Sequence, residues 1–265
     1  MKKLAGVLLL ILTLLLAGCS EGGKSASDWE YVKNKGKMTI GITYFEPMNY
    51  LDDNGDLKGF ETEFASAVCD ILGVTPEFQE INWSAKETEL KAKKIDCIWN
   101  GMTIDEDREK NMSISQPYMG NKQVLVVKQE NIDVYSDSAN GLNVVAESGS
   151  AGEIICNEEE FFRDSSFTGV DTQAKALMEV SAGTADAAVI DYVMSIGMIG
   201  ENTDFSGLAI VEERSFGEEN YGVAFRKEDT QLTKKINDAM DTLAQNGKLD
   251  EIAAKYKLDN LILLP

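Results

Sequence analysis

Residues 93–118 read KKIDCIWNGMTIDEDREKNMSISQPY, and this stretch decides the predicted fold. The β-rich run at 95–99 predicts a short strand, and Asn100-Gly101 ends it with a turn signal. The mixed-charge run DEDREK that follows contains Arg108. By residue type alone, Arg108 is a solvated member of that run, because interspersed charges of both signs are typical of an exposed surface.

Strands and helices alternate on both sides of this stretch. Apolar residues at 60–72 fall at helical spacing, and Gly73 then ends the helix. Ser84 and Glu87 form a capping-box pattern, which predicts the start of a helix that carries Leu90. This alternation predicts α/β architecture with mainly parallel sheets. Further strands are expected at 38–42, 124–127, 144–146, 187–190 and 221–225, further helices at 172–181 and 230–246, and a turn at 52–55.

The composition excludes several kinds of function. The chain has 265 residues, 25 Lys+Arg against 45 Asp+Glu, a formal charge of −20 and no histidine. Nucleic-acid binding needs clustered positive charge, so the acid excess argues against such a partner. Ser-His-Asp and Cys-His catalysis and His-ligated metals all need the missing imidazole. Apolar residues at 43% and charged residues at 26% fit a globular protein of one large domain or two lobes.

The N-terminus has the pattern of an export signal. Lys2 and Lys3 precede an apolar run at 4–16 that is too short to span a bilayer as an ordinary helix. The sequence LAGC at 16–19 resembles the lipobox of bacterial lipoproteins, which implies that Cys19 is diacylated and begins the mature chain. The alternatives are a plain signal peptide or a buried apolar end.

Residues 1–18 are therefore expected to be a signal peptide and 19–29 a lipid-anchored linker, because SEGGKSAS at 20–27 is polar and rich in Gly and Ser. The expected location is the extracytoplasmic face of the cell membrane. That face is extracellular in a Gram-positive cell and periplasmic in a Gram-negative one.

The three other cysteines are expected to be buried thiols. Cys69, Cys97 and Cys156 are odd in number, so they cannot all pair within the chain. Their spacing fits neither a disulfide framework nor a zinc site. Buried free cysteines act as small apolar side chains.

Several segments together resemble the polar amino-acid-binding proteins of bacterial ABC importers. The pattern G-M-T-I-x-x-x-R followed by Ser-x-Pro-Tyr within 93–118 is the most specific of them. The resemblance covers nearly all of the chain after the linker. The other segments are GITYFEPMNY (41–50), GFETEFASAVCDILGV (59–74), KQVLVVK (122–128), AGTADAAVIDYVMS (182–195), YGVAFRKEDTQL (221–232) and NGKLDEIAAKY (246–256).

The resemblance implies a two-lobed fold of the periplasmic-binding-protein type II class, which closes on one free amino acid. Each lobe would be a mainly parallel sheet flanked by helices, and two hinge strands would join the lobes. It implies ABC permease subunits in the membrane as partners, a monomer, no nucleic acid, no catalytic residue, and no cofactor or metal. The implied organisation is lobe 1 at 30–119, a hinge at 120–123, lobe 2 at 124–215, and at 216–265 the second hinge with the rest of lobe 1.

The same resemblance makes Arg108 the group that holds the ligand carboxylate. Its fixed N–H donors suit bidentate binding of a carboxylate. Thr103 would add a hydroxyl and a backbone N–H, and Gly101 would let the ligand approach the backbone closely, although it also fits a strand-exit turn. Asn100 belongs to the same expected set.

Lobe 2 is expected to supply the opposite side of the site from the loop ESGSAG at 147–152 and from Asp191. Small residues at a helix start expose backbone N–H groups, so Ser150 and the Ala151 N–H are expected at the carboxylate. An ordinary strand-to-helix turn is the alternative there. The family often has threonine where Ala151 stands, which implies a lost hydroxyl contact. Asp191 is assigned to the α-ammonium, with a helix N-cap as the alternative.

Aromatic rings are expected above and below the ligand side chain. The resemblance assigns Phe45 and Trp83 to this role, although 41–47 is one residue shorter than usual and the register of Phe45 is open. Trp83 also fits a core position. Glu46 and Glu147 are unusual acids near this region, and Glu147 is included in the expected binding set. If either points inward, a cationic or amide side chain is favoured, and the alternative for each is a solvated loop acid.

Two other function classes remain open. Cyclohexadienyl (arogenate or prephenate) dehydratases resemble these binding proteins, and Glu46 or Glu147 could supply the acid or base of a lyase. The predicted amino-acid clamp favours binding without turnover. The second alternative is the ligand domain of a sensor, which the lipobox and the end at Pro265 disfavour.

Overall fold

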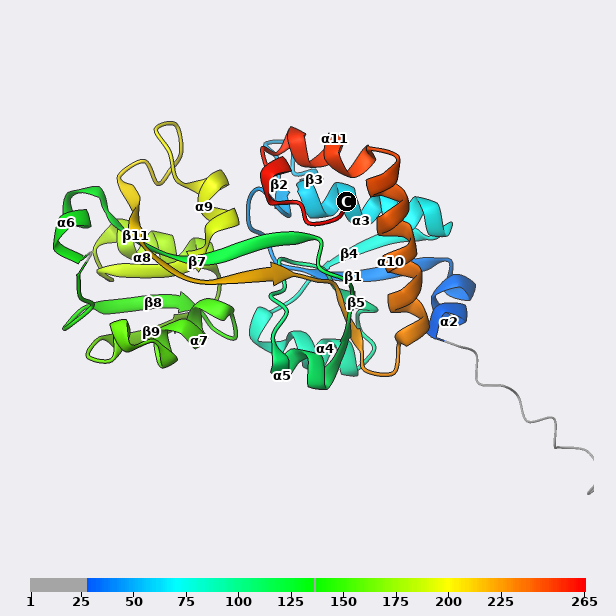
Figure 1. Ribbon diagram of the computed structural model, residues 1–265, viewed down its shortest axis with the longest axis horizontal. Coiled ribbons are helices and arrows are strands. Elements are labelled where there is room, and N and C mark those ends of the chain that lie inside the picture. Colours follow the sequence, from blue (N-terminus) through cyan, green and yellow to red (C-terminus); the bar gives the residue numbers. More distant parts are fainter. Residues whose placement is uncertain (1–27, 136) are drawn as a thin grey trace, which may run out of the picture.

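Two five-stranded sheets organise the part of the chain that the computed structural model describes, residues 28–135 and 137–265. Figure 1 shows each sheet at the centre of its own lobe, with helices on both faces. No helix within these residues combines the length and apolarity needed to cross a membrane. The predicted signal peptide, Cys19 and most of the linker lie outside the described residues.

The first lobe is built on the sheet β4-β1-β5-β12-β6. Its strands β4, β1 and β5 are parallel, and β12 runs antiparallel to both β5 and β6. The strand bounds are Lys37–Ile42 (β1), Thr75–Glu80 (β4), Cys97–Ile98 (β5), Met112–Ile114 (β6) and Ala224–Arg226 (β12), and a small hairpin is made by Tyr50–Leu51 (β2) and Leu57–Lys58 (β3). The helices are Asp28–Lys35 (α2), Phe60–Leu72 (α3), Lys86–Lys91 (α4), Glu106–Asn111 (α5), Thr230–Gln245 (α10) and Lys248–Lys255 (α11).

The second lobe is built on the sheet β11-β7-β10-β8-β9. Its strands β10, β8 and β9 are parallel, whereas β7 runs antiparallel to both β10 and β11. The strand bounds are Met119–Lys128 (β7), Asn143–Glu147 (β8), Ser166–Val170 (β9), Ala187–Asp191 (β10) and Leu208–Tyr221 (β11). The helices are Ile132–Tyr135 (α6), Ala151–Glu158 (α7), Gln173–Ala182 (α8) and Tyr192–Met198 (α9).

The long strands β7 and β11 cross from one lobe to the other as an antiparallel pair (Figure 1). Their register shifts between Phe216 and Glu218, and Gly217 between them has a φ of +57°. A left-handed residue at this point lets the strand bend without a Cβ clash. The predicted α/β class and the two connecting strands are confirmed. Within the two five-stranded sheets, every antiparallel strand pair involves a crossing strand, β7 or β11, or the strand β12 that follows β11 in the chain.

Local sequence signals predicted only part of the helices, and one predicted start is wrong. The helices α2, α5, α6 and α11 were not predicted. The helix α3 has the predicted bounds, and Gly73 ends it in the left-handed conformation. The predicted capping box at Ser84 is wrong, because the Ser84 hydroxyl donates to Asn82 Oδ1 at 2.6 Å. Asn82 instead caps a 3-10 turn at Trp83–Ala85, and α4 begins at Lys86 without a side-chain cap.

The predicted strand at 221–225 is two strands. β11 ends at Tyr221 and β12 begins at Ala224, because the chain changes partners between them. Gly222 N–H donates to the Met102 carbonyl at 2.9 Å, and Val223 N–H donates to Ser115 Oγ at 2.9 Å. The strands β4 and β9 and the first half of β11 were not predicted.

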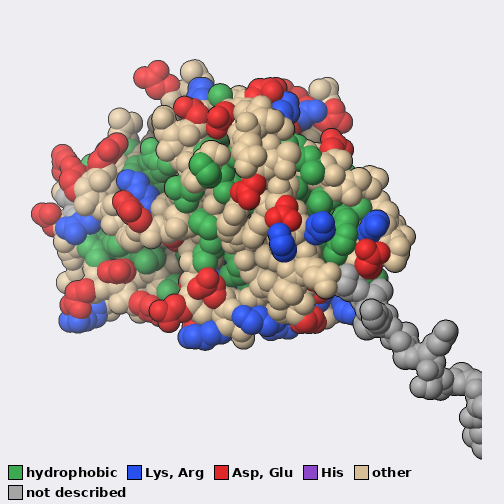
Figure 2. Space-filling model, turned by 45° about the vertical axis from the view of Figure 1, so that its right-hand side comes forward, with side chains coloured by type: hydrophobic (Ala, Val, Ile, Leu, Met, Phe, Trp, Pro, Cys, Tyr) green, Lys and Arg blue, Asp and Glu red, His purple; other side chains and the backbone are tan. Residues whose placement is uncertain are grey.

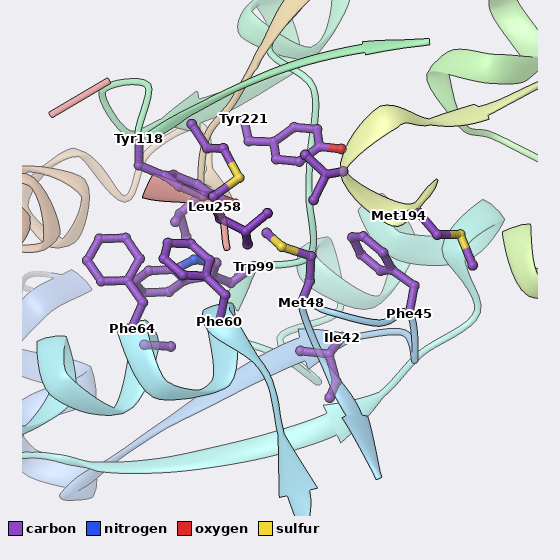
Figure 3. Packing of buried hydrophobic residues seen from close by; sticks show 14 of the residues in the cluster. Ile42, Phe45, Met48, Phe60, Phe64, Trp99, Tyr118, Met194, Tyr221 and Leu258 are labelled. Carbon is purple, nitrogen blue, oxygen red and sulfur yellow. The ribbon is translucent and has the colours of Figure 1, made fainter. Parts of the chain in front are cut away.

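A cluster of aromatic side chains joins α3 of the first lobe to the crossing strands (Figure 3). The Phe64 and Trp99 rings pack edge to face at 5.3 Å, and Tyr118 lies 6.4 Å from Tyr221 at the end of β11. Such pairs favour tilted and edge-to-face geometry. The cluster therefore holds the ends of both crossing strands against the first lobe.

The three cysteines Cys69, Cys97 and Cys156 are buried and free, as expected.

Charged side chains of both signs are interspersed on the face shown in Figure 2. Figure 2 shows Asp and Glu side chains scattered over the visible face, with Lys and Arg among them. The acid excess is therefore distributed on this face, where it favours solubility.

The start of α3 depends on Gly59, which has a φ of +128°. A Cβ at this position would lie 2.0 Å from the Met48 carbonyl oxygen. The close approach lets Phe60 N–H donate to Pro47 O and Glu61 N–H donate to Met48 O. Gly59 thereby docks α3 on the loop that carries Phe45.

We expect Gly59→Ala to lower the free energy of unfolding by at least about 3 kcal/mol, because both the backbone angle and the Met48 carbonyl oppose a Cβ. Gly55→Ala is the matched control: Gly55 has a φ of +81° and open space around its Cα. It should cost only about 1 kcal/mol. Urea denaturation of both variants measures the difference, and equal losses would contradict this account of Gly59.

Candidate functional site

A small enclosed cavity lies between the two lobes, with an empty volume of about 270 Å³. That size is near the lower end of ligand pockets, which are roughly 300–1,000 Å³. Every residue of the expected binding set lines it, and so does Gln173, which was not predicted. The lining is Phe45, Trp83, Asn100, Gly101, Thr103, Arg108, Glu147, Ser150, Ala151, Gln173 and Asp191. The structure thus brings the set together, and ligand binding by these residues stays a prediction.

Arg108 is buried, in contrast to what its mixed-charge surroundings suggest. Asp105 Oδ1 accepts the Arg108 N–H at the start of α5, and Asp105 Oδ2 lies 3.1 Å from Arg108 Nε. Nη1 donates to Thr103 O at 2.6 Å, and Nη2 donates to Gly149 O of the other lobe at 3.4 Å. A guanidinium has five N–H donors, so two remain without a partner among the described residues.

Asp191 ends β10 and is held by amide side chains. Asn121 Nδ2 donates to Asp191 Oδ1 at 2.7 Å, and Gln123 Nε2 donates to the same oxygen at 2.6 Å. Gln173 donates to Asp191 Oδ2 and accepts the Asp191 N–H at 2.8 Å. Although Asp191 is the N-cap residue of α9, its side chain makes no capping hydrogen bond. The carboxylate is therefore oriented by the sheet, and the cavity lies beside it.

A second carboxyl, Glu219 on β11, shares two of these amides. Asn121 and Gln123 also donate to Glu219 Oε1. The strand register explains the arrangement, since Asp191 pairs with Gln123 and Glu219 pairs with Asn121. Burial raises the pKa of Glu219 to about 7, and the charge of Asp191 adds to the rise. Sequence analysis missed this pair because it depends on the relative register of three strands.

The loop after β8 is fixed by its own capping interactions. Ser150 Oγ accepts the Glu153 N–H at 3.3 Å, and Glu153 accepts the Gly149 N–H. The expected turn into α7 and the cavity-lining position of Ser150 are therefore both present. Ala151 N–H lies in the first turn of α7, where backbone donors have no partner within the helix.

Glu147 ends β8 and is 4% exposed. Its Oε1 has no hydrogen-bond partner within the described residues. Burial raises the pKa of the Glu147 carboxyl to about 8, with the charge of Asp191 adding to the rise and Lys86 opposing it. Glu46, the other acid considered, does not line the cavity, and its backbone lies against Gly197 of α9.

Contacts of Lys86 hold the two lobes together in this structure. Lys86 Nζ donates to Gly149 O at 2.9 Å and to Trp83 O at 3.3 Å, and it lies 4.5 Å from the center of the Trp83 ring. Burial lowers the pKa of Lys86 to about 8, and the charge of Arg108 contributes to the decrease. The structure is therefore a closed arrangement of the lobes.

The buried carboxyl group of Glu61 supports the part of the first lobe that faces the cavity, and this role was not predicted. Glu61 accepts the Gly101 N–H at 2.7 Å, Asn49 Nδ2 at 2.8 Å and the Tyr118 hydroxyl. Gly101 has a φ of +54°, and a Cβ there would lie 2.8 Å from Phe45 Cζ. Glu61 thus fixes the backbone at Gly101, and the missing side chain leaves room for the Phe45 ring.

Asn100 contributes mainly to the same support. Its Oδ1 accepts the Thr43 N–H at 2.8 Å, and its Nδ2 donates to Thr43 Oγ1 at 2.6 Å. These bonds attach the turn after β5 to the end of β1.

No group of three or more Cys, Asp or Glu within the described residues has an arrangement that could hold a metal ion.

The family of the chain follows from comparison with known proteins. The family described as bacterial extracellular solute-binding proteins, family 3, matches residues 38–259. The chain belongs to this family. The predicted family is therefore confirmed, and the family places the protein on the extracytoplasmic side of the membrane.

Individual relatives agree with this assignment. The probable histidine-binding protein of Neisseria gonorrhoeae is 27% identical over 257 residues, covering 97% of this chain and 96% of that protein. The L-cystine-binding protein TcyJ of Escherichia coli K12 is 29% identical over 233 residues, with 85% and 84% covered.

A similar solved structure is an ABC uptake transporter substrate-binding protein from Streptococcus pneumoniae with bound histidine. It has a TM-score of 0.77 and 29% identity, and the match covers 88% of this chain and 97% of that one. The similar structures support the predicted type II periplasmic-binding fold. The relatives are binding proteins and not enzymes, which confirms the prediction of a non-enzyme and disfavours the dehydratase alternative.

The buried Glu61 should make stability depend on pH. Burial raises its pKa from an ordinary value near 4.5 to about 7, although the bonds from Tyr118, Gly101 and Asn49 oppose the rise. Between these two values the native state keeps a proton that the unfolded state has lost. Raising the pH through this window therefore lowers the free energy of unfolding, by up to about 3 kcal/mol.

Glu61→Gln has no proton to lose, so it should remove this part of the pH dependence. Urea denaturation of the wild type and the variant at several values between pH 4.5 and 7.5 measures the two slopes. Other carboxyls contribute equally to both proteins and cancel in the comparison. Parallel slopes would show that Glu61 is already ionised at pH 5.

Proposed function

We propose that this protein is the extracytoplasmic binding component of an amino-acid ABC importer. It would capture one free amino acid by closing its lobes and present the closed form to permease subunits in the membrane. The observation that carries the proposal is the enclosed cavity with Arg108 and Asp191 in its lining. A cation and an anion together match the two charged α-groups of an amino acid.

Arg108 would bind the α-carboxylate through its two remaining N–H donors. The Thr103 hydroxyl, the Ser150 hydroxyl and the Ala151 N–H would complete the hydrogen bonds to that group. All four line the same cavity, two from each lobe. Because donors come from both lobes, the full set around a carboxylate exists only when the lobes are closed.

Asp191 would bind the α-ammonium. Its carboxylate is already oriented by Asn121, Gln123 and Gln173, so binding requires little rearrangement. Pre-ordered groups lower the entropic cost of binding. Phe45 and Trp83 would pack against the ligand side chain, with Asn100 and Gly101 forming the cavity wall between them.

The crossing strands β7 and β11 would be the hinge. We assign lobe 1 to 30–119 and the part of 216–265 after the second hinge, the first hinge to 120–123 and lobe 2 to 124–215. The register shift next to Gly217 supports bending in the second crossing strand. A ligand that contacts both lobes favours the closed state by its additional contacts there.

We also propose that the protein acts as a monomer anchored by lipid at Cys19. The support for the lipid anchor is the lysine pair, the short apolar run and the LAGC sequence at the N-terminus. A single export signal with a lipid anchor would keep the binding lobes close to the permease without a membrane helix.

A thermal-shift screen of the chain from Ser20 against free L-amino acids tests the binding proposal. A ligand at 100 times its Kd should stabilise the protein by about 2.7 kcal/mol. Arg108→Met should weaken the best ligand by at least about 100-fold, because a buried charge-assisted contact is lost.

Lys110→Met is the matched control, since Lys110 lies on the same helix with its side chain 66% exposed. It should bind like the wild type. The proposal is wrong if no amino acid stabilises the protein, or if Arg108→Met and Lys110→Met bind equally well.

A further inference from the structure

We infer that the amino acid taken by this site carries a cationic side chain, and that Glu147 receives its charge. This inference rests on the proposed function and adds the class of substrate to it. The decisive observation is that Glu147 lines an enclosed cavity and that its buried Oε1 has no hydrogen-bond partner among the described residues. Buried carboxylates in proteins are paired or hydrogen-bonded, so such an oxygen indicates a missing donor.

The charges in the cavity lining point to the same ligand. The ionisable groups of the lining are Arg108, Asp191 and Glu147. The α-carboxylate of an amino acid would balance Arg108, and its α-ammonium would balance Asp191. One carboxyl group then remains at Glu147, and burial has raised its pKa to about 8. A neutral side chain would leave this carboxyl without an ionic partner, whereas an ammonium or guanidinium would favour its ionised form and pair with it.

Lys86 does not already neutralise Glu147. Its ammonium donates to the carbonyls of Gly149 and Trp83 and lies over the Trp83 ring. No ion pair between Lys86 and Glu147 is present among the described residues, and the pKa of Glu147 is raised to about 8 although the Lys86 charge opposes the rise. Lys86 therefore links the two lobes through Gly149, and Glu147 Oε1 still lacks a hydrogen-bond partner within the described residues.

The other acids near the site have partners or lie elsewhere. Glu219 is held by Asn121 and Gln123 and does not line the cavity. Asp105 is paired with Arg108 behind the lining. Glu46 also lies outside it. Among the acids considered, Glu147 alone combines a place in the lining with an unpartnered oxygen within the described chain.

The apolar part of the cavity suits the stem of such a side chain. Phe45 and Trp83 line the same space as Glu147. Aromatic faces bury methylene groups and attract a nearby cation, so they add to the preference for a long cationic side chain.

Isothermal titration calorimetry with two matched ligand pairs at pH 7 tests the inference. L-arginine and L-citrulline have nearly the same size and differ in side-chain charge, and so do L-lysine and L-norleucine. We expect the cationic member of at least one pair to bind at least about 30-fold more tightly, which corresponds to about 2 kcal/mol. Glu147→Gln should reduce that ratio to within about threefold of unity, because the amide keeps the shape and removes the charge.

Glu46→Gln is the matched control and should keep the wild-type ratio. Circular dichroism and thermal unfolding establish whether Glu147→Gln is folded. If it is not, Glu147→Asp retains the charge with a shorter reach, and it should lower the affinity for the cation while keeping the preference.

The outcomes separate this inference from the proposed function. If neutral amino acids bind as tightly as cationic ones, or if folded Glu147→Gln keeps the preference, the role of Glu147 is wrong and amino-acid binding stands. A preference that disappears in Glu46→Gln would also overturn the inference. If no amino acid binds to the wild type, the proposed function fails and this inference fails with it.

Discussion

A guanidinium buried between two lobes is the interaction on which the rest of the site depends. Arg108 donates to Thr103 O in one lobe and to Gly149 O in the other, with Asp105 behind it. A cation taken out of water needs anions and acceptors around it, or its burial is unfavourable. Under the proposed function, closure would become favourable when a ligand brings a carboxylate to the remaining donors. The burial of Arg108 explains why a charged residue in a polar run is part of an enclosed cavity.

The supporting structure keeps each polar group of the cavity in one orientation. Glu61 fixes the backbone at Gly101, and the paired amides Asn121 and Gln123 hold Asp191 from the crossing strand β7. Asp191, which we propose binds the α-ammonium, is thus attached to one of the strands that join the lobes. Glu147 differs from these groups because one of its oxygens has no partner in the described structure. Glu147 is therefore the feature from which we infer this chain's own ligand.

Sequence patterns predicted what depends on local or familiar spacing. Helical periodicity gave the bounds of α3, and the resemblance gave a lining set that the cavity contains in full. The partners of Asp191 and Gly101 were missed because strand register and a contact 40 residues away bring them together. The capping box at Ser84 failed because Asn82 competes for the same hydroxyl. Residue spacing could not show whether Glu46 or Glu147 faces the cavity, because that depends on how each loop packs between the lobes.

A crystal structure of the chain from Ser20 grown with L-arginine tests the central claim most directly. The account predicts one arginine in the cavity between the lobes, with its carboxylate on Arg108 and its α-ammonium on Asp191. The side-chain guanidinium should lie at Glu147, with its stem between Phe45 and Trp83. Arginine bound outside this cavity, or with its carboxylate away from Arg108, would contradict the account.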